Sequence, residues 1–346
     1  MHSTPALAAT KPPVAPDQGD APLLSVSDLR VEFAMRHGIV KAVDGVSFDL
    51  MRNETLCIVG ESGSGKSVTM QALMGLVPMP PGRLGSGRAL FGDQKTDLLA
   101  LDESAMRQYR GARLAMIFQD PMTSLNPYLK LSKQLTEGEV RSGRLTEDQA
   151  RKRALDLLGR VGIPDAARRM DSYPHQFSGG MRQRIMIAMA LMGRPDILTA
   201  DEPTTALDVT VQAAILDLLK DLQAETRMAI VLITHDMGVV ARMADRVAVM
   251  YAGRIVEMAR VREIFARPRH PYTSGLLHSV PRVDGPIERL ESIPGQPPDL
   301  ASLTRGCAFA PRCSRARPEC TAENATEVLA AAFSAHQTRC LFPMNS

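Results

Sequence analysis

Two segments of this chain carry residue types that bind anions. Residues 60–67 read Gly-Glu-Ser-Gly-Ser-Gly-Lys-Ser and fit the pattern G-x-x-x-x-G-K-[ST]. In that pattern backbone N–H groups wrap phosphates, the lysine contacts them and the last hydroxyl binds Mg²⁺. Residues 178–180 read Ser-Gly-Gly and open a helical sequence, whose N-terminus is a second anion site. Because one nucleotide needs only one phosphate cradle, a chain with two is expected to close on a second copy or a sister subunit, with the nucleotide between them.

The surroundings of residues 60–67 favour a phosphate-binding loop over a glycine-rich turn that binds nothing. Thr55–Val59 is a short apolar run typical of a buried parallel strand, and residues 67–76 have helical spacing. A strand before and a helix after is the context that gives the pattern its meaning. The Ser67 hydroxyl is expected on Mg²⁺, and the residues expected around the phosphates are Gly60, Ser62, Gly63, Ser64, Gly65 and Lys66.

Two acidic residues stand at the end of a second apolar run, residues 197–200. Asp201, at the end of the predicted strand, suits Mg²⁺, bound directly or through water. Glu202, one residue further, points elsewhere in an extended chain and can polarise an attacking water as general base. A pair of acids after a strand can also be a solvated turn, and that alternative stays open on these two residues alone.

The rest of the pattern predicts the elements that must position these residues. Residues 23–266 read as one α/β unit, in which further apolar runs predict buried core strands at 115–118, 196–200, 229–234 and 247–250. A helical insert is predicted at about residues 120–177, because Thr146–Gln149 has the form of a capping box and apolar residues follow at helical spacing. The Pro-rich residues 267–346 are predicted to form a separate, small and irregular C-terminal module.

Composition restricts the function classes. The chain has 346 residues, 45% of them hydrophobic, enough for one large and one small domain with a sizeable core. A net charge of +3 favours neither nucleic acid nor an anionic membrane as a partner. No apolar run approaches the roughly 18 to 20 residues that span a bilayer, so a membrane role must come through partners. Residues 1–22 lack the basic and apolar regions of a signal peptide and are predicted to be a disordered tail.

Four of the five cysteines gather in the C-terminal module, at Cys307, Cys313, Cys320 and Cys340. A cytosolic protein is not expected to keep disulfides, so clustered thiols suggest a metal site. The intervening five, six and nineteen residues give neither a short zinc knuckle nor a bacterial ferredoxin spacing, so the spacing does not choose the metal. Four reduced thiols packed as small hydrophobes are the alternative, and His336 could replace one thiolate. Cys57, inside the first core strand, is predicted to be a core residue.

Six features, in order and context, resemble the ATP-binding-cassette ATPases. They are the loop 60–67, Gln119 after the run 115–118, the segment 177–184, the acids 201–202, the loop 203–208 and His235 after the run 229–234. The resemblance implies an α/β fold with a P-loop ATPase core and a helical insert subdomain. It also implies ATP hydrolysis, with ATP and Mg²⁺ bound at the motifs described above.

The same resemblance implies roles for individual residues. Gln119 would contact Mg²⁺ and water and report the nucleotide state to membrane subunits, and His235 would contact the γ-phosphate. Phe33 would stack on adenine, although a buried core phenylalanine is an equal alternative. The residues that would act in trans, on the nucleotide held by the opposite subunit, are Ser178, Gly179, Gly180 and Asp208.

Further segments resemble the oligopeptide/dipeptide importer subfamily, namely residues 120–127, 270–273 with 275–277, and 293–298. This resemblance covers about residues 23–340. It implies an ATP-hydrolysing subunit, peripheral at the cytoplasmic face of a bacterial inner membrane, that powers import of di- or oligopeptides or related solutes. The implied partners are a second ATPase subunit, identical or homologous, two permease subunits and, indirectly, a solute-binding protein, with no nucleic acid. At the four cysteines the resemblance implies a four-iron, four-sulfur (4Fe-4S) cluster.

Two other function classes fit parts of the sequence. A soluble cassette ATPase of DNA repair or translation would share the nucleotide motifs, but the sequence lacks a basic face, a long coiled-coil insert and a second cassette. An iron–sulfur redox enzyme would share the cysteines, but the sequence has no flavin or nicotinamide fingerprint. Within the importer subfamily, nickel complexes or glutathione are alternative cargoes. The sequence does not name the cargo, because specificity lies in other subunits.

Overall fold

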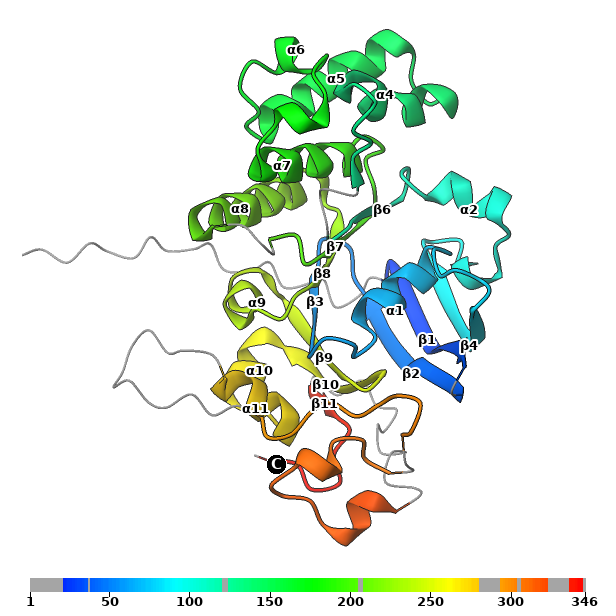
Figure 1. Cartoon of the computed structure of the whole chain (residues 1–346), viewed down its shortest axis with the longest axis vertical. Coiled ribbons are helices and arrows are strands. Elements are labelled where there is room, and N and C mark those ends of the chain that lie inside the picture. The colour runs from blue at the N-terminus through cyan, green and yellow to red at the C-terminus, as the bar shows by residue number, and fades with distance from the viewer. Residues whose placement is uncertain are drawn as a thin grey trace, which may run out of the picture.

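A seven-stranded sheet lies at the centre of the molecule (Figure 1). The computed structural model describes residues 21–36, 38–119, 124–204, 208–279, 293–303, 306–322 and 336–344. The strand order is β11-β10-β9-β3-β8-β7-β6, and the strands from β9 to β6 run parallel. The parallel strands are β3 (Thr55–Val59), β6 (Leu114–Ile117), β7 (Ile197–Asp201), β8 (Ala229–Ile233) and β9 (Arg246–Tyr251).

All of the apolar runs predicted as core strands form these parallel strands, within one residue of the expected bounds. Strands β3, β7 and β8 are buried at every residue. A parallel strand covered on both faces has no solvent side, so its sequence reads as a continuous apolar run and not as an alternation. The prediction of these strands is therefore confirmed.

A second, antiparallel sheet packs beside the central one. Its order is β2-β1-β4-β5, with the bounds Gly38–Leu50, Leu24–Met35, Gly82–Phe91 and Thr96–Asp97. Helix α1 (Lys66–Leu73) contacts β1 and β2. Val31, Val43, Leu56 and Leu73 belong to one buried cluster, which joins this sheet, the central sheet and α1. The segment before α1 is thereby held between the two sheets.

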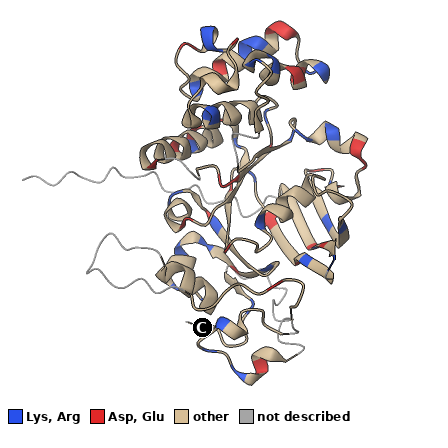
Figure 2. Cartoon of the chain, in the orientation of Figure 1, with Lys and Arg blue, Asp and Glu red and all other residues tan. Residues whose placement is uncertain are grey.

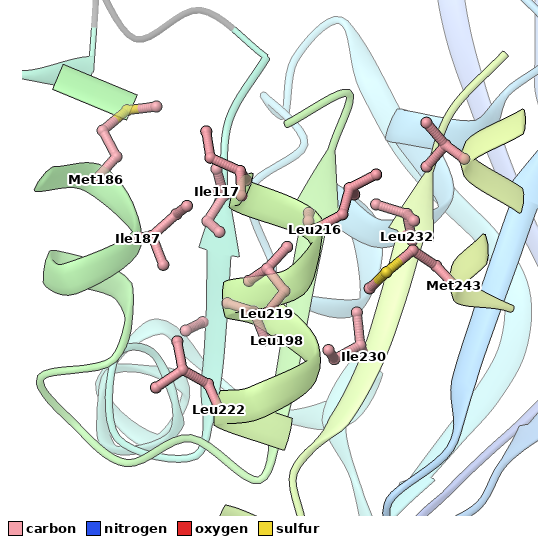
Figure 3. Close-up of a cluster of buried hydrophobic side chains, with 14 of the residues drawn as sticks. Ile117, Met186, Ile187, Leu198, Leu216, Leu219, Leu222, Ile230, Leu232 and Met243 are labelled. Carbon is pink, nitrogen blue, oxygen red and sulfur yellow. The ribbon is translucent and has the colours of Figure 1, made fainter. Parts of the chain in front are cut away.

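Helices cover the other face of the central sheet. They are α7 (Gly179–Ala190), α8 (Val209–Thr226) and α9 (Met237–Met243). Successive residues of a strand point to opposite faces, so Ile230 of β8 enters the cluster under these helices while Val231 enters the cluster on the other face. Figure 3 shows Ile187 of α7 and Leu219 of α8 within the same cluster as Leu198 of β7. Because α7 and α8 are packed on the sheet, the segments at their N-termini have fixed positions.

The predicted helical insert lies at one end of the molecule (Figure 1). It contains α4 (Leu131–Arg141), α5 (Glu147–Arg160), α6 (Ala166–Arg169) and the short 3₁₀ helix η2 (Pro174–Gln176). The capping box of α5 is confirmed. The Gln149 N–H donates to the Thr146 hydroxyl (3.3 Å), and the Thr146 N–H donates to the Gln149 side-chain oxygen (3.0 Å). Its buried stripe has the expected helical spacing and consists of Ala150, Ala154, Leu157 and Leu158.

The C-terminal part of the chain packs on the core. Strand β11 (His336–Thr338) pairs antiparallel with β10 (Arg254–Arg260) and extends the central sheet. The buried Glu257 carboxylate of β10 accepts backbone hydrogen bonds from Arg269 (2.7 Å) and His270 (2.8 Å) and lies 2.6 Å from His336 Nε2. Residues from the predicted separate module thus complete a core sheet. The remaining helices are α2 (Glu103–Tyr109), α10 (Val261–Ala266), α11 (Pro271–His278), η1 (Leu98–Ala100), η3 (Ala310–Arg312) and η4 (Pro318–Thr321).

Charged residues of both signs are interspersed on the surface elements (Figure 2). On α4, for example, Arg141 pairs with Glu137 over 3.1 Å. Within the described ranges, no helix is both long enough and apolar enough to cross a bilayer. Residues 1–20, most of the predicted tail, lie outside the described residues.

Candidate nucleotide site

The predicted phosphate loop connects the end of β3 to the start of α1. At two of its positions the neighbouring backbone is so close that only glycine fits. Gly60 has φ 152° and Gly65 has φ 98°, a region that favours glycine. A Cβ atom at Gly60 would lie 2.2 Å from the Met250 carbonyl oxygen, and one at Gly65 would lie 2.2 Å from the Ala42 carbonyl oxygen. Backbone from β9 and β2 therefore closes around the loop so tightly that no side chain fits.

The polar side-chain atoms of Lys66 and Ser64 in the loop are buried. The Lys66 ammonium donates to the carbonyl oxygens of Gly60 (2.8 Å) and Glu61 (3.0 Å). Burial lowers the pKa of Lys66, while the nearby carboxylates of Glu202, Asp201 and Glu61 oppose the shift. In the described part of the chain the buried Ser64 hydroxyl makes no hydrogen bond. A buried ammonium and a buried hydroxyl without a partner, in a loop of glycines, fit the oxygen atoms of a phosphate.

The two residues expected at Mg²⁺ meet from different elements. Ser67 lies in the first turn of α1, and Asp201 is the last residue of β7. The Ser67 hydroxyl and the Asp201 carboxylate are close enough to interact. Burial raises the pKa of Asp201, and the neighbouring Ser67 hydroxyl works against that rise. A hydroxyl and a carboxylate together are oxygen ligands of the kind Mg²⁺ prefers, so the pair fits the ion.

The three residues predicted as catalytic lie together. One oxygen of Glu202 accepts a hydrogen bond from the Gln119 side-chain amide over 3.1 Å, and the other lies 3.1 Å from His235 Nδ1. Gln119 and His235 follow β6 and β8, the strands on either side of β7. Parallel strands end at the same edge of a sheet, so three residues far apart in sequence converge there.

The backbone at Glu202 is in an uncommon conformation. Its φ is 47°, in the left-handed region that residues with a side chain avoid, and its N–H donates to the Ile233 carbonyl oxygen over 2.9 Å. Such a conformation costs of the order of 1 kcal/mol and persists only where the surroundings impose it. Here it turns the chain directly after Asp201, so the two carboxylates face different partners.

The predicted second anion turn and Asp208 are neighbours. Ser178 caps α7, its hydroxyl accepting from the Met181 N–H over 3.4 Å. Asp208 caps α8, its carboxylate accepting from the Val211 N–H over 3.0 Å. A Cβ atom at Gly180 would lie 3.3 Å from the Val211 side chain, whereas one at Gly179 would meet no heavy atom of the described residues within 4 Å. The two helices therefore begin side by side. Residues 205–207, in the loop before Asp208, lie outside the described residues.

Comparison with known proteins decides the family. Residues 43–205 match the ABC transporter family, and residues 256–320 match the C-terminal region of oligopeptide/dipeptide transporters. The dipeptide transport ATP-binding protein DppD of Bacillus subtilis is 56% identical, over 84% of this chain and 86% of its own length. The chain belongs to the ABC transporter family.

Other similar proteins agree with this assignment. The oligopeptide transport ATP-binding protein OppD of Escherichia coli is 51% identical over 89% of this chain and 90% of its own length. A dimeric ATP-binding cassette in a post-hydrolysis state, bound to ADP and Pi, superposes with a TM-score of 0.62 at 27% identity, over 69% of this chain and 99% of that one. The structure of cbiO1 from Clostridium perfringens gives a TM-score of 0.60 at 30% identity, over 71% and 92%.

The predicted α/β P-loop ATPase fold and the ATPase activity are thereby confirmed. ATP is the substrate of this ABC ATPase and Mg²⁺ the metal ion expected with it. The matches do not favour the alternative of a DNA repair or translation ATPase.

A hollow of about 320 Å³ adjoins the phosphate loop of this ABC ATPase. It is lined by loop residues 61–64, by Val40 of β2, by residues 251–252 and by residues 297–300 of the C-terminal part. Phe33, predicted at adenine, pairs across β1 and β2 with Val40. The Phe33 ring also lies against Gly82 of β4, where a Cβ atom would be 3.2 Å away. Val40, which sequence reasoning missed, thus lines the hollow directly, with Phe33 as its cross-strand neighbour.

Three other contacts of the site were not predicted. The Gln183 side-chain amide of α7 donates to the Pro203 carbonyl oxygen over 2.6 Å. The Glu61 N–H donates to the Tyr272 hydroxyl of α11 over 2.8 Å. The Glu61 carboxylate accepts two hydrogen bonds from the Arg312 guanidinium. None of these has a local sequence signal, because each joins residues from different parts of the chain.

The four C-terminal cysteines line one hollow, together with His270 and Phe309. Burial raises the pKa of the Cys307, Cys313 and Cys340 thiols. Across the described ranges, however, no three Cys, His, Asp or Glu side chains are grouped so that they could hold a metal ion. The predicted 4Fe-4S cluster is therefore not supported.

His336, considered as a replacement ligand, pairs instead with Glu257 over 2.6 Å. Cys57 is fully buried in β3, as predicted for a core residue.

Proposed function

We propose that this chain is the ATP-hydrolysing subunit of a bacterial membrane importer for di- and oligopeptides. The observation that carries the catalytic part is the placement of Glu202 between Gln119 and His235, at the sheet edge that also holds the phosphate loop. The peptide cargo is supported by relatives named for dipeptide and oligopeptide transport and by the match of residues 256–320. The proposed location is the cytoplasmic face of the inner membrane, where the chain would be bound peripherally.

In this proposal the phosphates of ATP lie on residues 60–67. Lys66 exchanges its two carbonyl partners for the β- and γ-phosphates, and Ser64 gains the acceptor it lacks within the described chain. Ser67, Asp201 and Gln119 would hold Mg²⁺, which neutralises phosphate charge when bound. Phe33 and Val40 are the residues proposed near the base, because they lie beside the hollow that adjoins the loop.

Glu202 is the proposed general base. Its two oxygens are held by Gln119 on one side and His235 on the other, so the carboxylate is oriented before a water arrives. A base that is already oriented loses little rotational freedom at the moment of reaction, which is how positioning lowers a barrier. His235 has a side chain that is 64% exposed, which leaves it accessible to a γ-phosphate.

The second ATPase subunit, identical or homologous, would complete each site. Ser178, Gly179, Gly180 and Asp208 stand at two neighbouring helix N-termini, where backbone N–H groups attract anions. In the proposed dimer they contact the nucleotide on the partner's phosphate loop. ATP then favours the closed dimer because the γ-phosphate contact exists only there, and hydrolysis removes that difference in affinity.

The proposed docking site for the permease subunits is the part of the insert that carries Tyr128, Leu129 and Tyr173, three exposed large hydrophobic side chains. Their exposed fractions are 86%, 37% and 37%. The two segments are joined by a hydrogen bond from the Leu131 N–H to the Ser172 carbonyl oxygen, 3.0 Å long. Exposed apolar surface marks interaction sites, and this part of the insert begins nine residues after Gln119 in the sequence.

Reconstitution tests the proposed function. The chain would be co-purified with the permease subunits and solute-binding protein of its own importer, placed in proteoliposomes and supplied with ATP inside. Expected results are uptake of labelled di- or oligopeptides and peptide-stimulated ATP hydrolysis, both lost in Lys66→Ala. Uptake of a nickel complex or of glutathione, with no peptide uptake, would replace the cargo while leaving the ATPase assignment intact.

Chemical analysis tests whether the four C-terminal cysteines hold an iron–sulfur cluster. Its support is that Cys307, Cys313, Cys320 and Cys340 share one hollow; the absence of a metal-holding group in the described residues counts against it. Protein purified without oxygen would contain about four irons and four acid-labile sulfides per chain if the cluster exists. Stoichiometric zinc would establish a different metal, and protein without metal would leave four reduced thiols packed as small hydrophobes.

A further inference from the structure

The C-terminal part of the chain reaches the phosphate loop through one arginine. Arg312 lies in η3, one residue before Cys313, and its side chain is 6% exposed. Its guanidinium donates two hydrogen bonds to the Glu61 carboxylate, from Nη1 to Oε2 (2.6 Å) and from Nη2 to Oε1 (2.9 Å). Glu61 directly follows Gly60 and belongs to the phosphate loop. This bidentate pair therefore joins the loop to a residue 251 positions away in sequence. Paired parallel hydrogen bonds of this kind are the strongest and most oriented that a carboxylate makes.

The arginine is itself fixed by several acceptors. Its Nε donates to the Pro294 carbonyl oxygen over 2.9 Å, and Nη1 lies 3.3 Å from the Tyr251 hydroxyl. The hydrogen bonds to Glu61 and Tyr251 raise the pKa of Arg312, so its charge is permanent at any physiological pH. A buried and fully bonded guanidinium cannot swing away without loss, and it therefore sets the position of the carboxylate it binds.

Glu61 is hydrogen-bonded through its backbone as well as through its side chain. Its N–H donates to the Tyr272 hydroxyl (2.8 Å), and its carbonyl accepts from the Lys66 ammonium (3.0 Å). Tyr251, Tyr272 and Phe309 pack ring against ring, with centroids 4.6 to 5.3 Å apart. The first turn of the phosphate loop is thus connected to the cysteine-containing segment through Arg312 and through this aromatic cluster.

A carboxylate in this position has an electrostatic cost. The loop must accept the several negative charges of a nucleotide triphosphate, and Glu61 adds one more beside them. An adjacent guanidinium cancels that charge, and the cancellation is strong because the pair is largely removed from water. Without Arg312 the same carboxylate would repel the phosphates and would leave a partly buried charge unpaired.

We propose that Arg312 is a positioning residue for the phosphate loop, and that the C-terminal cysteine segment controls nucleotide affinity through it. The inference rests on the proposed function only in that residues 60–67 bind the phosphates of ATP. Coupling between two sites is reciprocal, so nucleotide binding must stabilise the segment that carries Arg312 by the same factor. Cys307 and Cys313 flank η3, so the rate at which their thiols react with a label should report the stability of this segment.

The first test is a double-mutant cycle on the full-length chain, with Mg-ATP affinity measured by titration in Arg312→Met, Glu61→Gln and the combination. Arg312→Met is expected to weaken ATP binding by at least about tenfold, because it leaves the Glu61 carboxylate unpaired beside the phosphates. Adding Glu61→Gln should restore most of the affinity, because the repelling charge is gone. A double variant as weak as Arg312→Met would overturn the proposal, as would unchanged affinity in Arg312→Met.

Two controls separate this inference from its alternatives. Arg317→Met removes an exposed arginine of the same segment, which lies over the Phe342 ring, and should leave ATP affinity unchanged. Lys66→Ala should abolish binding in every background. If it does so while Arg312→Met binds normally, the proposed function stands and only the role of Arg312 fails. If Lys66→Ala itself binds ATP normally, the proposed function fails.

The second test uses the wild-type chain and does not depend on any variant folding. Thiol labelling of Cys307 and Cys313 would be timed without nucleotide and with saturating Mg-ATP at a temperature that prevents turnover. Labelling is expected to slow several-fold with Mg-ATP, since the bound nucleotide holds Glu61 and through it η3. Equal labelling rates in the two conditions would mean that the segment and the loop are not coupled.

Discussion

The Gln183 side-chain amide donates a hydrogen bond to the backbone carbonyl oxygen of Pro203, and the two atoms are 2.6 Å apart. Gln183 is buried on α7, the helix that begins at the Ser178 turn, and Pro203 follows Glu202. Within one subunit, this hydrogen bond therefore links two parts of the proposed mechanism. The Ser178 turn is proposed to act on the partner's nucleotide, and Glu202 on the nucleotide of its own subunit. A shift of α7 on contact with the partner would be transmitted directly to the Glu202 turn.

Replacing Gln183 with Leu should impair hydrolysis more than nucleotide binding. The leucine keeps a similar volume but leaves the Pro203 carbonyl oxygen without its buried donor, at a cost of about 1 to 3 kcal/mol. We expect a lower kcat with little change in the KM for ATP, together with a lower melting temperature. An unchanged kcat in a destabilised variant would show that the contact serves only stability.

Replacing Glu202 with Gln should leave ATP binding intact and slow hydrolysis by at least ~10²-fold, the usual scale for losing a general base. The amide keeps one oxygen that can accept from Gln119, so the surroundings should change little. The variant should also trap a closed, ATP-bound dimer, which size-exclusion chromatography with Mg-ATP would detect. Hydrolysis near the wild-type rate would exclude Glu202 as the base.

Replacing Gly65 with Ala should weaken ATP binding by on the order of tenfold or more. The new Cβ atom would lie 2.2 Å from the Ala42 carbonyl oxygen, on a residue whose φ of 98° already disfavours a side chain. The loop must therefore shift, and its N–H groups with it. Gly63→Ala is the matched control: its φ of 78° carries similar strain, but its Cβ would meet no atom of the described residues within 4 Å. Equal losses of ATP affinity in both variants would mean that backbone strain at positive φ weakens binding, and not the contact with the Ala42 carbonyl oxygen.

The sequence predicts the parts of this site that depend on local pattern. The parallel strands were predicted to within one residue because strands such as β7 and β8 are buried on both faces and read as continuous apolar runs. The phosphate loop was predictable because Gly60 and Gly65 are required by the backbone itself. Asp201 and Glu202 were predictable as a pair because they stand where an apolar strand ends.

Contacts between distant parts of the chain were not predictable in the same way. The pair of Glu61 and Arg312 depends on how the C-terminal segment packs over the core, and 251 positions separate the two residues. The pairing of β11 with β10 rests on three residues whose sequence has no strand signal of its own. The four cysteines were correctly expected in one place, but their spacing carries no information on whether the sulfur atoms converge on a metal.

His270 should make the stability of the fold depend on pH. Burial lowers the pKa of His270 to about 4 from an ordinary value of 6.5, so the folded chain keeps it neutral where the unfolded chain protonates it. Its contribution is complete above pH 6.5 and is lost as the pH falls toward 4, by about 3 kcal/mol in all. His270→Asn keeps a side-chain acceptor for the Tyr272 N–H that caps α11. Urea unfolding of both proteins between pH 7.5 and 5 should give a flatter dependence for the variant; parallel curves would exclude His270 as the source.

Ser178 is predicted to act on the nucleotide of the opposite subunit, and mixed dimers of differently tagged chains can test this. In one arrangement a Ser178→Arg change and a Lys66→Ala change lie on the same chain, so each of the two composite sites carries one lesion. In the other they lie on separate chains, so one site carries both lesions and the other carries none. Action in trans predicts higher ATPase activity for the second arrangement, because one intact site remains. Action within one subunit predicts the reverse order, since the intact site would then be found in the first arrangement, and equal activities would exclude a contribution of Ser178 in trans.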